Sequence, residues 1–164
     1  MNALHGTSRA SHQRIVGGGD PVPVFSESNV SLGGAYFTTS APHARFHAET
    51  AAREHASEAV VLTIALDESK LLPDEDWVVL AFEESPLNAA DEILDPRLRA
   101  FFDDLFVGYI ADSSLSDHYK ARYAELNASH GITWRNSAQW IQRFRQADGI
   151  AAHQVIRVEV VALD

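Results

Sequence analysis

The 164-residue chain contains no cysteine, and this absence narrows its chemistry. Without thiols it has no disulfide, no thiolate metal ligand and no cysteine nucleophile. It also lacks an apolar run of the roughly 20 residues that a membrane-spanning helix needs. Its first residues lack the apolar stretch of a signal peptide. We therefore expect a soluble chain without a membrane anchor.

Basic residues are also scarce, since 13 Lys and Arg face 23 Asp and Glu for a net charge of -10. Residues 51–117 carry sixteen of the acidic residues and only four of the basic ones. Because duplex nucleic acid is held by many Lys and Arg contacts to phosphate, this balance disfavours a protein that wraps a duplex. The two ends of the chain are better placed to bind an anionic ligand, provided that they meet in one cleft.

The composition, 46% hydrophobic and 22% charged residues, is typical of a globular protein. The chain has no repeat, low-complexity tract or linker, so residues 1–164 are predicted to form a single domain. Periodicity and capping residues predict strands at 3–6, 35–39, 60–66, 77–82 and 154–162. They predict helices at 9–16, 40–56, 96–110, 118–130 and 137–147. With strands concentrated at both ends, this order indicates an α+β fold.

Three other sequence patterns resemble binding sites but are better explained by ordinary surface or core positions. His43 and His47 have the i, i+4 spacing of a zinc site on a helix, but the glutamate of the usual zinc motif is missing, so no metal is expected. The acidic run at 73–76 lacks the glycine and alternating ligands of a calcium loop and is expected to be a solvated edge. Trp140 and Phe144, at helical spacing, are expected in the core.

Three segments share a pattern with one known family. They are Leu-His-Gly-Thr-Ser at 4–8, Gly-Gly-Ala-Tyr-Phe-Thr-Thr-Ser at 33–40 and Ala-Arg-Phe-His-Ala at 44–48. Together they resemble the ADP-ribosyltransferase fold in its branch of diphtheria toxin and poly(ADP-ribose) polymerases. The resemblance is specific over residues 3–56 and resumes at 153–158. It implies a split β-sheet core with flanking helices and a pocket for NAD.

The family resemblance also implies roles for individual residues. His5 would hydrogen-bond the adenosine-side ribose, and the backbone of Gly6, next to Thr7, would hold the nicotinamide carboxamide. Gly6 has no Cβ, so its backbone can approach a flat ring. Tyr36 would stack on the nicotinamide, with Phe46 or His47 closing the other side. Thr38, on the same strand face as Tyr36, would reach a ribose or carboxamide group.

The third signature residue of the family stands at the start of a late strand, and the resemblance assigns it to Gln154. Strand alternation puts residues 154, 156, 158 and 160 on one face, which is predicted to be the core face. The family usually has glutamate at this point. Glutamine can anchor a ribose hydroxyl but cannot act as a general base, which makes chain elongation unexpected. The alternative is that Gln154 only satisfies backbone groups at a strand end.

The resemblance therefore predicts an NAD-dependent mono-ADP-ribosyltransferase with His5, Tyr36 and Gln154 as catalytic residues and NAD as co-substrate. The acceptor, expected to be a nitrogen nucleophile, is a protein, a nucleic acid base or a small molecule. A toxin, an effector delivered to its target or a cytoplasmic modifying enzyme all fit. An NAD glycohydrolase is one alternative, and a noncatalytic module that binds NAD or a partner is another.

Overall fold

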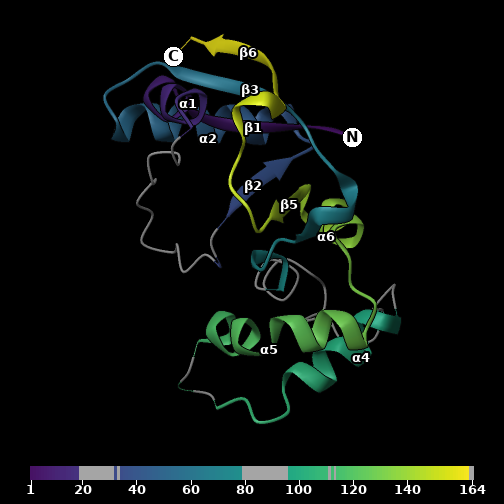
Figure 1. Cartoon of the computed structure of the whole chain (residues 1–164). Coiled ribbons are helices and arrows are strands. Elements are labelled where there is room, and N and C mark those ends of the chain that lie inside the picture. The colour runs from purple at the N-terminus through teal and green to yellow at the C-terminus, as the bar shows by residue number, and fades with distance from the viewer. Residues whose placement is uncertain (19–31, 33, 79–95, 111, 113, 163–164) are drawn as a thin grey trace.

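The computed structural model describes residues 1–18, 32, 34–78, 96–110, 112 and 114–162 (Figure 1). Six strands form one antiparallel sheet in the order β4-β5-β2-β1-β3-β6. The strands are β1 (Asn2–Ser8), β2 (Ala35–Thr38), β3 (Ala59–Ala65), β4 (Leu71–Pro73), β5 (Arg143–Gln146) and β6 (Val155–Val161). The expected α+β class is confirmed.

The sheet has two halves, one of β1, β3 and β6 and the other of β2, β4 and β5, which are joined by a short pairing of β1 with β2. β1 pairs with β3 along its whole length, from Asn2 to Ser8, whereas β1 and β2 share only the pair Leu4 and Thr38. Figure 1 shows β2 turning away from β1 toward β5. A gap in the backbone pairing therefore opens beside His5 and Gly6, between β1 and β2.

Helix α2 (Ala41–Glu54) covers one face of the sheet over β1 and β3. Ser40 caps it and Pro42 stands in its first turn, as the sequence predicts. Four alanines, Ala44, Ala48, Ala51 and Ala52, are buried against the strands. Because these side chains are small, the helix packs so closely that a Cβ on Gly6 would lie 1.8 Å from the Ala44 carbonyl oxygen.

Helix α1 (Arg9–Val16) begins and ends where the sequence predicts, because Ser8 accepts a hydrogen bond from the Ser11 amide and Gly17 follows the last turn. Its Ile15 joins the main core. That core lies on the sheet face opposite α2 and contains Val60, Leu62, Ile64, Phe37 and Phe144.

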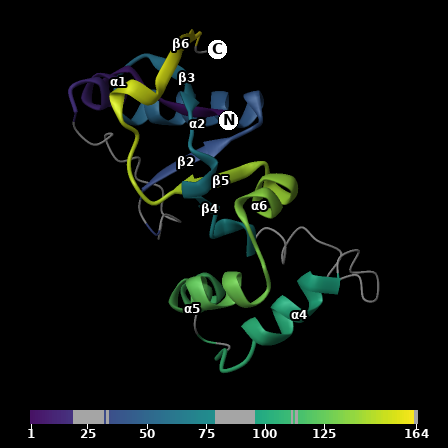
Figure 2. The same cartoon turned by 45° about the vertical axis from the view of Figure 1, so that its right-hand side comes forward.

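A second core is built of aromatic side chains at the β4 end of the molecule (Figures 1 and 2). Helices α4 (Pro96–Leu105) and α5 (Leu115–Ser129) contribute Phe101 and Tyr119, which pack against Trp77. The Trp77 indole donates to the Tyr119 hydroxyl at 3.2 Å. Helix α4 ends five residues earlier than predicted, and α5 begins three residues earlier. None of the described helices is long and apolar enough to cross a membrane.

The helix predicted at 137–147 is confirmed only as far as Ile141 and is wrong beyond it. Helix α6 covers Trp134–Ile141, Gln142 takes a left-handed conformation (φ 57°), and the chain continues as β5. Phe144 is buried as predicted, but on a strand paired with β2 and β4. The strand predicted at 77–82 is also wrong where it is described, because residues 76–78 are helical. Residues 79–82 lie outside the described part.

The prediction for the last strand is corrected as well. Gln154 belongs to a short 3-10 turn (Ala152–Gln154) before β6 begins at Val155. The row predicted to be buried is exposed: Ile156 by 53%, Val158 by 37% and Val160 by 52%. Alternation identifies which side chains share a face, but not that β6 is the outermost strand of the sheet.

Candidate functional site

A cavity of about 520 Å³ opens between α2, the end of α6 and the start of β5. Its lining consists of His43, Phe46 and His47 from α2 and residues 139–143. Phe46 is 61% exposed, and its ring meets the His47 ring edge-on with centroids 5.5 Å apart. The volume is that of a small-molecule site. Two residues predicted to bind NAD thus share one cavity.

Gln142 lies in the same cavity, directly before β5. Its left-handed backbone is held by the Thr38 hydroxyl, which donates to the Gln142 carbonyl at 2.6 Å, and by the Thr39 amide at 3.1 Å. The Thr38 oxygen also accepts from the Ser40 amide at 3.0 Å. Thr38 is 3% exposed. In this structure its hydroxyl therefore ties Gln142 to the start of α2.

The cavity is lined by one arginine and by a histidine whose pKa is lowered. Partial desolvation, reinforced by the nearby Arg143, His5 and His43, lowers the pKa of His47 to about 4, although the residue as a whole is exposed. Arg143 lies 3.6 Å from the Asp74 carboxylate and 3.8 Å from that of Asp76. Arg143 is the only Lys, Arg, Asp or Glu in the described lining of the cavity.

Tyr36 stands on the same sheet face as Arg143, because Tyr36 pairs with Arg145 and Thr38 with Arg143. Its hydroxyl donates to the Glu75 carboxyl at 2.5 Å. The Leu32 amide donates to the same oxygen at 2.9 Å. These contacts fix the orientation of the Tyr36 ring.

The acidic run at 73–76 is not the solvated edge that its sequence suggests. Asp74 and Glu75 are each 1% exposed, and burial raises the pKa of Asp74 to about 7. Arg145, 5% exposed, lies 3.8 Å from Glu75. Within the described part of the chain, one carboxyl oxygen of each acid and two nitrogens of Arg145 make no hydrogen bond. Sequence reasoning missed this cluster, since nothing local distinguishes it from a surface run.

His5 bridges the gap between the two halves of the sheet. Its Nδ1 lies 2.8 Å from the Tyr36 carbonyl oxygen, and its ring lies 6.0 Å from that of Phe37. A carbonyl only accepts, so Nδ1 carries the proton. Burial lowers the pKa of His5 more than this hydrogen bond raises it. The neutral ring therefore offers Nε2 as a hydrogen-bond acceptor.

Gly6 and Thr7, the other two residues of the first motif assigned to the NAD pocket, both pack against neighbouring elements. Gly6 lacks a Cβ in front of Ala44 and Ala48, so the close approach that requires glycine is that of helix α2. Packing against α2 thus accounts for the glycine, and a role of the Gly6 backbone in holding a nicotinamide carboxamide stays a prediction. Thr7 is 3% exposed and pairs with Val60 of β3.

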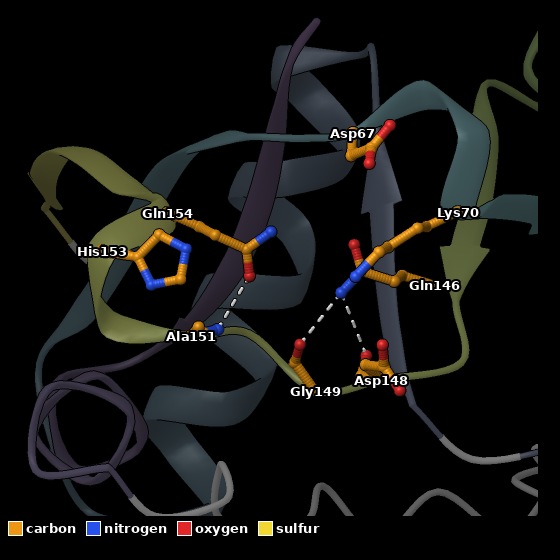
Figure 3. Close-up of a pocket in the computed structure, with 8 residues that line it drawn as sticks. All are labelled: Asp67, Lys70, Gln146, Asp148, Gly149, Ala151, His153 and Gln154. Carbon is orange, nitrogen blue, oxygen red and sulfur yellow. Dashed lines mark hydrogen bonds between the residues drawn. The ribbon is translucent and has the colours of Figure 1, made fainter.

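Gln154 lies in a different cavity, of about 330 Å³, shown in Figure 3. Its side-chain oxygen accepts from the Ala151 amide at 2.8 Å, and its nitrogen donates to the Ala65 carbonyl at 3.4 Å. Gln154 thus satisfies backbone groups at a strand end, which was the alternative interpretation. The His5 ring meets Tyr36 at its backbone carbonyl, while the Tyr36 side chain points to the other face of the sheet, toward Glu75. Neither His5 nor Tyr36 belongs to the described lining of the His47 cavity, and Gln154 lies in another cavity.

Among the residues described, no three His, Asp or Glu side chains gather as a metal-ion site. Comparisons with models of known families, with curated proteins and with solved structures found no match for this chain. The residues and their geometry are therefore the only guide to function.

Proposed function

We propose that this chain is an NAD-dependent mono-ADP-ribosyltransferase, which breaks the nicotinamide–ribose bond and transfers ADP-ribose to a nitrogen nucleophile. One observation supports this most: Phe46 and His47, expected at an NAD pocket from their motif, line one cavity with a glutamine at the start of a late strand. The gap between β1 and β2, where His5 meets Tyr36, is a second support.

The proposed roles follow from chemical character. The exposed Phe46 ring and the neutral His47 ring offer flat faces to the nicotinamide. Arg143 supplies the positive charge that a diphosphate requires. Nε2 of His5 accepts a hydrogen bond from a ribose hydroxyl.

We assign to Gln142 the role that the family resemblance gives to Gln154. In the reaction the C–N bond breaks, its electron pair leaves with nicotinamide, and the acceptor nitrogen bonds to the ribose carbon and then loses a proton. A carboxylate about 4 Å from the developing positive charge contributes roughly 4 kcal/mol at an effective dielectric of 20, and an amide dipole only part of this. A nucleophile that needs no general base is therefore the expected acceptor.

The test is release of nicotinamide from NAD by the purified protein, alone and with cell extract. We expect His47→Ala and Gln142→Ala to reduce release at least tenfold, and Gln154→Ala, the matched control in the other cavity, to leave it near wild type. Release that depends on extract indicates transfer, and release without extract indicates an NAD glycohydrolase. Loss in Gln154→Ala with normal turnover in Gln142→Ala would overturn the assignment.

A second function, a noncatalytic module that binds NAD, is favoured by a specific feature. The described lining of the cavity contains no aspartate or glutamate, so the carboxylate that the family usually uses is missing there. This alternative predicts that calorimetry detects NAD binding, weakened by His47→Ala, while no nicotinamide forms at any protein concentration.

A further inference from the structure

Among the described strands, β6 ends the sheet and pairs on one side only, with β3. Figures 1 and 2 both show it at the outer end of the molecule, with no described element beyond it. Every second residue of an edge strand presents its backbone N–H and C=O groups outward. Natural proteins protect such edges with prolines, bulges or charged side chains, above all lysine. β6 contains neither proline nor lysine, its charged residues Arg157 and Glu159 pair with each other, and its irregularity lies near its start, so residues 157–161 form a regular edge.

One face of this edge is apolar and open. Val158 and Val160 stand opposite Leu62 and Val60 of β3, which are fully buried, yet they are themselves 37% and 52% exposed. Ile156 adds 53% exposure. The apolar row of the core thus continues onto a strand that is left uncovered.

The charges on the other face are arranged symmetrically about Val158. Arg157 and Glu159 flank it, form an ion pair at 3.1 Å, and have side chains that are 71% and 59% exposed. If two copies of β6 align antiparallel about a two-fold axis at Val158, Arg157 of each copy faces Glu159 of the other. Val158 then faces its own copy, and Ile156, the residue at the irregularity of β6, lies toward Val160.

We propose that β6 pairs with β6 of a second copy of this chain in that register and forms a dimer with a continuous sheet. The sequence disfavours the neighbouring registers. An axis at residue 157 would oppose two arginines, an axis at 159 would oppose two glutamates, and a shift by one residue would put apolar against charged side chains. The strand is therefore complementary to itself in one arrangement, which is the property of a two-fold interface.

Charge reversal tests this pairing. Sedimentation equilibrium of the full chain, up to about 100 µM, measures the dissociation constant of the dimer. Arg157→Glu alone leaves only glutamates at the interface, and Glu159→Arg alone leaves only arginines. We expect each variant to dimerise at least tenfold more weakly than wild type, because both symmetry-related pairs become repulsive.

Two rescues make the test specific. A mixture of the Arg157→Glu and Glu159→Arg proteins should form a heterodimer, since glutamate then faces arginine at every position. The double variant with both changes should again dimerise by itself. Asp103→Lys, at an exposed position of helix α4 at the opposite end of the molecule, is the control and should dimerise as wild type does.

A wild-type chain that stays monomeric over the whole concentration range overturns the proposal. So does a dimer that the single reversals leave unchanged, because it must then use another surface. Single variants that dimerise weakly but do not recombine in the mixture would refute the register.

Discussion

Replacing Gly6 by alanine tests whether helix α2 lies directly on β1. The new Cβ would lie 1.8 Å from the Ala44 carbonyl oxygen and 2.7 Å from the Ala48 amide, whereas real Cβ atoms essentially never come closer than 3.0 Å to such neighbours. Both obstacles are backbone atoms, so no rotamer change relieves the clash. Helix and strand must separate by about 1 Å in an interface packed at crystal density.

Overpacking of this kind costs typically 1–3 kcal/mol. We expect about 3 kcal/mol here, which lowers the melting temperature by roughly 6–12 °C for a chain of this size. Urea unfolding and thermal melts measure it. Gly17→Ala is the matched control, since its Cβ would lie 3.3 Å from its nearest neighbour and its φ of -75° suits alanine. Wild-type stability in Gly6→Ala, with NAD binding alone lost, would refute the packing argument and restore the role that the motif implies.

Three further predictions concern protonation and the Tyr36 contact. Burial raises the folded-state pKa of Asp74 from 3.8 to about 7. Between these pH values the folded protein keeps a proton on Asp74 that the unfolded chain releases. The free energy of unfolding therefore falls as pH rises across this interval, by up to roughly 4 kcal/mol. Asp74→Asn should remove that slope from urea unfolding, and an unchanged slope would contradict the burial. Because the pKa of His47 is lowered to about 4, an NMR titration should show this ring neutral above about pH 5, and a midpoint near 6.5 would contradict the lowered pKa. Tyr36→Phe removes the hydroxyl donor from the buried Glu75 oxygen and leaves only the Leu32 amide, so it should lower the free energy of unfolding by about 1–3 kcal/mol. An unchanged unfolding midpoint would show that the contact is absent in solution.

Local signals predicted the elements that local interactions determine. Ser8 and Gly17 set the ends of α1, and Ser40 with Pro42 sets the start of α2, because capping uses residues within one turn. The resemblance assigned Phe46 and His47 to a binding pocket, and the structure places both in one cavity, although whether NAD binds there stays a prediction.

Features that depend on distant partners were missed. The run 137–147 has helical spacing, but Phe144 pairs with Phe37, more than a hundred residues away, and this pairing makes β5 a strand. Glu75 is buried because Tyr36 and Arg145 meet it. Two glutamines precede late strands, and only the fold determines that Gln142, not Gln154, reaches the cavity of His47.

A crystal structure of the protein soaked with NAD would test the central claim most directly. We predict density for the nicotinamide ring against Phe46 and His47, with the Gln142 amide near the ribose and the diphosphate near Arg143. Density for the dinucleotide in the cavity of Gln154, or no density at saturating NAD, would contradict it.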